Sequence, residues 1–127
     1  MERQGVTYLL DSVILIDHLN DIRASTQFLA KEHLRCAISA ITRAEVLTGL
    51  EAAAREAAAE LLDFFPCLPL TCTDADLAAT LRRNHGWKLP DAIQAALAQR
   101  NRLKLATRNS RDFDPQRHPF VVVPYRV

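Results

Sequence analysis

The chain has 127 residues, of which 49% are hydrophobic and 24% are charged, and 16 Lys and Arg against 15 Asp and Glu give a net charge of +1. This length suits one domain of about 100–150 residues, and we predict a single domain over residues 1–127. The near-neutral charge excludes a protein that coats nucleic acid by charge alone. It does not exclude a nuclease, because acidic catalytic groups cancel basic substrate-binding groups in the sum.

The sequence predicts a protein of the cytoplasm. Charged residues interrupt every apolar run well before the ~18 residues of a membrane span. Asp11 and Asp17 fall where a secretory signal would be apolar. The three cysteines, Cys36, Cys67 and Cys72, have the spacing of neither a zinc site nor a CxxC pair. We therefore expect reduced thiols.

The first half of the chain alternates short apolar runs with helical patterns. Ser12 and Ser39 each follow an apolar run, and we expect each to cap the next helix. Pro66 ends an Ala-rich segment of high helix propensity. In chain order, the predicted elements are a strand over residues 6–10, helices over 12–20 and 22–33, a strand over 36–38, and helices over 40–50 and 51–65.

The second half continues this alternation. Thr73 is expected to cap a helix with Asp74 and Asp76 in its first turn. Gly86 suits the end of that helix, and Pro90 suits the first position of the next one. The predicted elements are an extended segment over residues 67–70, helices over 73–84 and 90–102, and strands over 103–106 and 120–123, with a polar loop over 107–119.

Strands that alternate with helices predict an α/β fold. We expect a three-layer α/β/α sandwich with a central, mostly parallel sheet, since parallel strands need helical crossovers on both faces. Ligands of such sheets bind at the carboxyl ends of the strands. The functional site should therefore lie at that edge.

Four acidic residues are placed to meet at that edge. Asp11 ends the first strand, and Glu45 lies early in the helix after the second strand. Asp91 is in the first turn of the helix that begins near Pro90, and Asp112 follows the fourth strand. Each alone has an ordinary structural explanation, but four clustered carboxylates repel one another unless a cation joins them. Hard oxygen ligands favour Mg²⁺ or Mn²⁺, which assist phosphodiester hydrolysis.

Several stretches of the chain carry a family resemblance. They read LLDSVILIDHL at 9–19, ISAITRAEVLTGL at 38–50, LPDAIQAALA at 89–98, NRLKLATRNSRDF at 101–113 and VVVPY at 121–125. In this order and spacing they resemble the PIN domain family, and in particular the VapC-type toxin ribonucleases of bacterial toxin–antitoxin pairs.

The resemblance implies an endoribonuclease that depends on Mg²⁺ or Mn²⁺. It gives the metal ligands and catalytic acids as Asp11, Glu45, Asp91 and Asp112. It also implies a fold of the predicted α/β/α type, a small antitoxin as partner, and a homodimer. The apolar helices over residues 41–62 are our candidate for either interface. The residues expected to support the metal site are Ser12, Thr107 and Asn109.

One position departs from the family pattern. The opening motif usually reads Asp-Thr-Asn or Asp-Ser-Asn, whereas here Val13 follows Asp11 and Ser12. A polar contact is therefore missing, which leaves open a catalytically weak or inert scaffold that only binds RNA or protein. A phosphoryl-accepting receiver domain and a haloacid-dehalogenase-like phosphatase are disfavoured. The first lacks its lysine after a late strand, and the second lacks its Asp-x-Asp motif.

Cations lie close in sequence to these acids and are candidates for binding the phosphates of a substrate. The residues chosen for this role are Lys88, Arg108 and Arg111, with Arg43, Arg82 and Arg83 as further basic neighbours. Trp87, the only tryptophan, is expected to fill a gap or to stack on a base. Phe113 is expected in the core.

Overall fold

Five short strands form a central sheet in the computed structural model, which describes residues 5–127. The strands are β1 (Tyr8–Leu10), β2 (Cys36–Ser39), β3 (Cys67–Leu68), β4 (Lys104–Ala106) and β5 (Val121–Val122). Their order across the sheet is β3-β2-β1-β4-β5, and every pairing between neighbours is parallel. The predicted parallel sheet is therefore confirmed.

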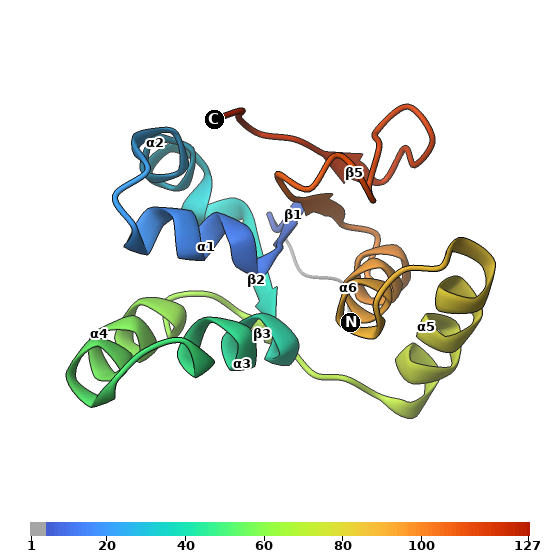
Figure 1. Cartoon of the computed structure of the whole chain (residues 1–127), viewed down its shortest axis with the longest axis horizontal. Helices are drawn as coiled ribbons and strands as arrows, with labels where there is room; N and C mark the ends of the chain where they lie inside the picture. The colour runs from blue at the N-terminus through green and yellow to red at the C-terminus, as the bar shows by residue number, and fades with distance from the viewer. Residues whose placement is uncertain (1–4) are drawn as a thin grey trace.

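Helices cover both faces of the sheet. They are α1 (Ser12–Leu19), α2 (Arg23–Glu32), the short 3₁₀ turn η1 (His33–Arg35), α3 (Ala40–Thr48), α4 (Ala52–Leu62), α5 (Cys72–His85) and α6 (Leu89–Arg100). Figure 1 shows α1 to α4 on one side of the strands and α5 with α6 on the other. This is the predicted three-layer sandwich. Within residues 5–127, no helix has the length and apolarity to cross a membrane.

Alternation along the strands divides the core between the two layers. Leu9 of β1 packs with α5 and α6, whereas its neighbour Leu10 packs with α1, α3 and α4. The same division holds for Leu105 and Ala106 of β4. Both faces of the sheet are thus apolar, which is why its strands read as short continuous apolar runs. Phe113 is fully buried in the α5–α6 core, as predicted.

The structure corrects two predicted helix caps. The cap of α1 is Asp11, whose side chain accepts from the Ser12 backbone N–H, so Ser12 is the first helical residue. The cap of α5 is Thr71 instead of Thr73. Its hydroxyl and the Asp74 carboxylate each bond to the other residue's backbone N–H, which forms a capping box.

Some predicted ends are wrong by a few residues. Because α5 begins earlier than predicted, Asp76 lies beyond its first turn. In α6, Pro90 is the second residue and not the first. The helix α4 stops at Leu62 and leaves 63–65 in a turn. The helix α6 ends at Arg100 and not at residue 102, where Arg102 has a left-handed φ of 56° that a helix cannot include. The single domain over residues 1–127 stays a prediction.

Candidate active site

The structure brings the four predicted acids into one electrostatic neighbourhood at the carboxyl edge of the sheet. Asp91, in the first turn of α6, shows this best. Its pKa is raised to about 6, chiefly by burial and then by the negative charges of Asp11, Asp112 and Glu45. Lys88 opposes this rise in the pKa of Asp91 through its positive charge. The site is therefore strongly anionic and in need of cations.

Asp11 is the most rigidly held of these acids. Only 7% of it is exposed, because it stands between the end of β1 and the start of α1. Its Oδ1 accepts from the Ser12 backbone N–H at 2.8 Å, and its Oδ2 accepts from the Thr107 hydroxyl at 2.7 Å. Burial raises the pKa of Asp11, and these two hydrogen bonds oppose that rise. Both oxygens are thus fixed in place before any ligand arrives.

Glu45 approaches the same site from α3. The residue is exposed, yet partial desolvation of its carboxylate is the main cause of a raised pKa. The Ser12 side chain lowers the pKa of Glu45, and the Asp11 charge raises it. Ser12 therefore interacts with two of the four acids, with Asp11 through its backbone N–H and with Glu45 through its side chain. Its supporting role stays a prediction.

The loop after β4 carries the fourth acid in a small hydrogen-bonded turn. The Asn109 side-chain amide donates to Asp112 Oδ2 at 3.1 Å, and the Asp112 backbone N–H donates back to Asn109 Oδ1 at 3.4 Å. The Asn109 backbone N–H donates to the Thr107 hydroxyl at 3.0 Å, and the Trp87 indole N–H donates to the Asp112 carbonyl at 3.1 Å. Asn109 and Thr107 thus place Asp112 relative to Asp11.

A buried polar network, not foreseen from the sequence, joins the elements that carry three of the acids. Gln94 of α6 accepts from the Ser39 hydroxyl at 2.7 Å and donates to the Thr42 hydroxyl at 2.5 Å. Thr42 in turn donates to the Leu10 carbonyl, directly before Asp11, at 3.0 Å. All three side chains are at most 1% exposed. A lone glutamine in the apolar stretch AIQAALA was the available signal.

Arg108 does not face the acid cluster freely. Its guanidinium makes two bonds to the Asp17 carboxylate, at 2.7 and 2.9 Å, and the Tyr125 hydroxyl donates to the same carboxylate at 2.7 Å. Asp17 is buried, and its pKa is lowered chiefly by the hydrogen bonds from Arg108. The sequence signal for this pair was an acid within an apolar helix, which needs a partner.

The other predicted cations divide into paired and unpaired groups. Arg43 is bound to Asp63 at 2.9 Å. Lys88 and Arg111 are exposed, and in the part of the chain that the structure describes neither has a carboxylate within 4.0 Å. Lys88 and Arg111 are therefore available to a polyanionic ligand, and Arg108 is much less so.

The donor set fits a hydrated divalent cation. Asp11, Glu45, Asp91 and Asp112 offer only carboxylate oxygens, which hard cations prefer. Their mutual repulsion at Asp91 is what a bound cation would relieve. Across residues 5–127, no three His, Cys, Asp or Glu side chains stand at the spacing of a preformed metal cage.

Val13 takes a packing role at the position where an amide was expected. Its side chain is half-buried and packs against the core that contains Leu10 and Ile14. An isopropyl group is favoured there by burial. The hydrogen bonds that fix Asp11 come from Ser12 and Thr107, so they do not depend on an amide at this position.

Comparisons with known proteins agree over nearly the whole chain. The PIN domain model matches residues 8–116. Ribonuclease VapC10 of Mycobacterium tuberculosis is 34% identical over 128 aligned residues, which cover 93% of this chain and 96% of that protein. A toxin–antitoxin complex from Klebsiella pneumoniae matches with a TM-score of 0.87 and 36% identity, over 95% of this chain and 100% of that chain. VapBC2 from Rickettsia felis, bound to a promoter DNA fragment, has a TM-score of 0.76 at 18% identity over 96% and 99% of the two chains, which shows the fold alone.

Proposed function

Because the chain belongs to the PIN domain family and to its VapC-type ribonucleases, we propose that it is an endoribonuclease that hydrolyses RNA phosphodiester bonds. Ribonucleases of this family generally depend on a divalent metal, and we propose Mg²⁺ or Mn²⁺ for this chain. The observation that supports the proposal is the placement of four carboxylates at the carboxyl edge of the sheet. There, burial and then the charges of Asp11, Asp112 and Glu45 raise the pKa of Asp91. A group of carboxylates kept at this cost to the fold needs a functional reason.

The roles of the residues follow from how each is held. Asp11, with both oxygens fixed by hydrogen bonds, would hold the metal. Asp91 and Glu45 would supply further negative charge to balance that of the cation. Asp112 is positioned by Asn109 and closes the site from the loop side. A bound divalent cation supplies the means to activate water and to stabilise the charge on the leaving oxygen. No side-chain nucleophile is required.

Replacing Asp91 with Asn tests this assignment. The substitution keeps the shape of the side chain but removes a charge from the metal site, so we expect cleavage of RNA to fall at least about 100-fold. The measurement is the initial rate on total cellular RNA with saturating Mg²⁺ or Mn²⁺. Asp76→Asn, an exposed acid of α5, is the control and should leave the rate unchanged.

An Asp91→Asn protein that cleaves as fast as the parent would contradict the metal assignment. A parent protein that binds Mg²⁺ in calorimetry yet cleaves no RNA would contradict the nuclease. A parent that does neither would favour the inert scaffold.

We further infer a protein partner. The similar chain from Klebsiella pneumoniae occurs in a toxin–antitoxin complex, and we propose that this chain is the toxin of such a pair in the cytoplasm. The proposed interface, for an antitoxin or a second copy in a homodimer, lies on α3 and α4 over residues 41–62. A groove there is lined by Ala40, Arg43, Ala44, Leu47, Thr48 and Arg55. Light scattering of the chain alone measures whether it forms a homodimer. Light scattering of the chain co-expressed with the product of the neighbouring gene measures whether it forms a complex with an antitoxin.

A further inference from the structure

A pocket of about 360 Å³ lies where the chain turns from α5 into α6. It is lined by Ala79, Arg82, Arg83, Gly86, Trp87 and Leu89. Gly86 adopts a left-handed φ of 72°, which ends α5 and directs the chain towards α6. No atom within 4 Å would meet a side chain added at Gly86, so the space in front of it is open.

The side chains that line this pocket include two cations, Arg82 and Arg83, and no acid. Between Asp76 and Asp91 the sequence contains Arg82, Arg83 and Lys88 and no acid. The four ion pairs among the described residues involve none of these three cations. Because both arginines and the lysine are exposed, their charges are accessible to an anion.

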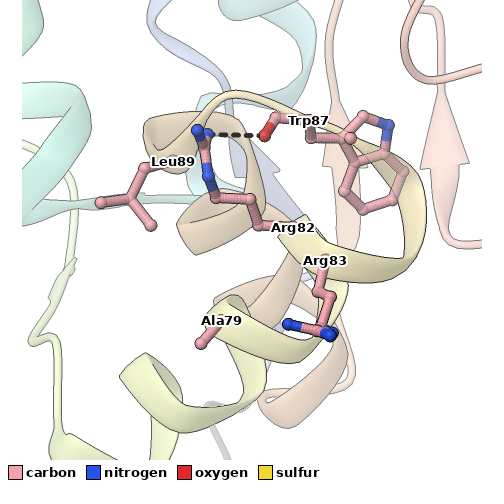
Figure 2. A pocket seen from close by; sticks show the side chains of 6 residues that line it. Ala79, Arg82, Arg83, Trp87 and Leu89 are labelled. Carbon is pink, nitrogen blue, oxygen red and sulfur yellow. Dashed lines mark hydrogen bonds between the residues drawn. The ribbon is translucent and has the colours of Figure 1, made fainter.

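One arginine is held in place by the wall of the pocket. Figure 2 shows the Arg82 guanidinium donating to the Trp87 carbonyl, a bond of 2.8 Å, with the indole ring on the other side of the backbone. A guanidinium has five N–H donors, so most of those of Arg82 remain free. Fixing a guanidinium in advance lowers the entropy lost when it binds a ligand.

Trp87 also connects the pocket to the acid cluster. Its carbonyl holds Arg82, while its indole N–H holds the Asp112 carbonyl at 3.1 Å. Leu89, on the opposite wall, stands two residues before Asp91 in the first turn of α6. Two residues that line the pocket are therefore linked to residues of the proposed metal site, Trp87 by a hydrogen bond to Asp112 and Leu89 by its position in the chain before Asp91.

We propose that this pocket binds a phosphate group of the RNA backbone, with the Arg82 guanidinium as the hydrogen-bond donor and Arg83 adding positive charge at the pocket. The inference rests on the proposed function, since RNA supplies the phosphate. It assigns the cationic side of the site to the α5–α6 turn, in place of Arg108, which Asp17 already occupies. The competing explanation is that both arginines only stabilise the carboxyl end of the α5 dipole.

Binding of RNA to a chain that does not cleave it separates these explanations. The probe is a short fluorescein-labelled single-stranded RNA of mixed sequence, and the protein is the full chain with Asp91→Asn and Mg²⁺. In this background, Arg82→Gln and Arg83→Gln should each raise the Kd by roughly two- to fivefold, the effect of losing one exposed charge pair. The slope of log K against log salt should also fall by about 0.7 for each phosphate that is no longer neutralised.

The controls keep this result specific. Arg83 has no side-chain hydrogen bond among the described residues, so its replacement leaves the fold intact even where Arg82→Gln disturbs the turn. Arg23→Gln, an exposed cation at the start of α2, should leave the Kd and the salt slope unchanged. An Arg83→Gln protein with a lower melting temperature but an unchanged Kd and slope would overturn the proposal, as would an equal weakening in Arg23→Gln.

The assay also separates this proposal from the proposed function. Parent protein that cleaves RNA while Arg83→Gln binds normally would refute the phosphate pocket and leave the nuclease standing. Weaker binding in both arginine variants supports the pocket, whatever the cleavage rate of the parent. In the cleaving protein we expect Arg83→Gln to raise KM about as much as Kd, with kcat nearly unchanged.

Discussion

Arg108 is a structural residue, because its main partner is a buried carboxylate. Asp17 is 5% exposed, and removing the guanidinium would leave its charge without an ion pair in the interior. Loss of one partner of a buried pair costs about 3–5 kcal/mol, and the 35% exposure of the Arg108 side chain reduces this to about 2 kcal/mol. We therefore expect Arg108→Met to lower the melting temperature clearly.

The pH dependence of this loss follows from Asp17. Its pKa is lowered below the ordinary 3.8 in the folded protein, so the pair stabilises the fold above that value and loses its effect as the pH falls through the lower folded pKa. The gap in melting temperature between parent and Arg108→Met should be full at pH 7 and shrink below pH 4. Arg111→Met, in the same loop but at an exposed residue, should have the same melting temperature as the parent. A gap that does not change with pH would contradict this account.

At the scale of elements, the start of α5 shows how tertiary contacts choose between two equivalent caps. Thr71 and Thr73 each stand three residues before an aspartate, so both match the capping-box pattern. The choice is made by Asp74, which is 4% exposed and paired with Arg100 of α6 at 2.7 Å. We expect Thr71→Ala to cost about 1 kcal/mol in the free energy of unfolding and Thr73→Ala only a few tenths. Chemical denaturation measures both, and equal costs would contradict the cap.

The buried glutamine of α6 allows a second comparison at this scale. Gln94→Leu keeps the volume of the side chain but removes the 2.7 Å acceptor of the Ser39 hydroxyl and the amide donor to Thr42. Only the longer contact of 3.5 Å from the Ser39 hydroxyl to the Thr42 hydroxyl then remains between these side chains. An unsatisfied buried polar group costs about 1–3 kcal/mol, so a loss of this size is expected in chemical denaturation. Gln99→Leu, in the same helix but exposed, is the matched control. A loss in Gln99→Leu as large as in Gln94→Leu would show that helix propensity, and not the network, is responsible.

These elements also show what a sequence can predict. The strands and helices can be predicted from the periodicity of apolar residues. The position of Asp11, Glu45 and Asp91 at one edge can be predicted from the rule that ligands of parallel sheets bind at the carboxyl ends of the strands. The cap at Thr71 and the orientation of Arg108 depend on residues distant in the chain. No local pattern contains that information, because such contacts exist only once the layers have packed.

At the scale of the whole molecule, the acid cluster lies where the two helical layers meet. Asp11 and Glu45 come from the α1–α4 side, and Asp91 from the α5–α6 side. Their repulsion therefore acts between the layers, and Gln94 helps to hold the layers together against it by bonding across to Ser39 and Thr42. The acid cluster should therefore lower the stability of the metal-free protein.

The sign of this effect can be measured through Asp91. Its pKa rises from the ordinary 3.8 to about 6 on folding, so the metal-free fold loses stability as the pH rises through this window. Asp91→Asn removes the charge and should stabilise the metal-free protein at pH 7 by about 1–2 kcal/mol, allowing for partial solvent screening. With a chelator present, the gap in melting temperature should close towards pH 4. Adding Mg²⁺ or Mn²⁺ should then raise the melting temperature of the parent more than that of Asp91→Asn. An Asp91→Asn protein that is less stable than the parent at pH 7 without metal would contradict the view that the charge of Asp91 destabilises the fold.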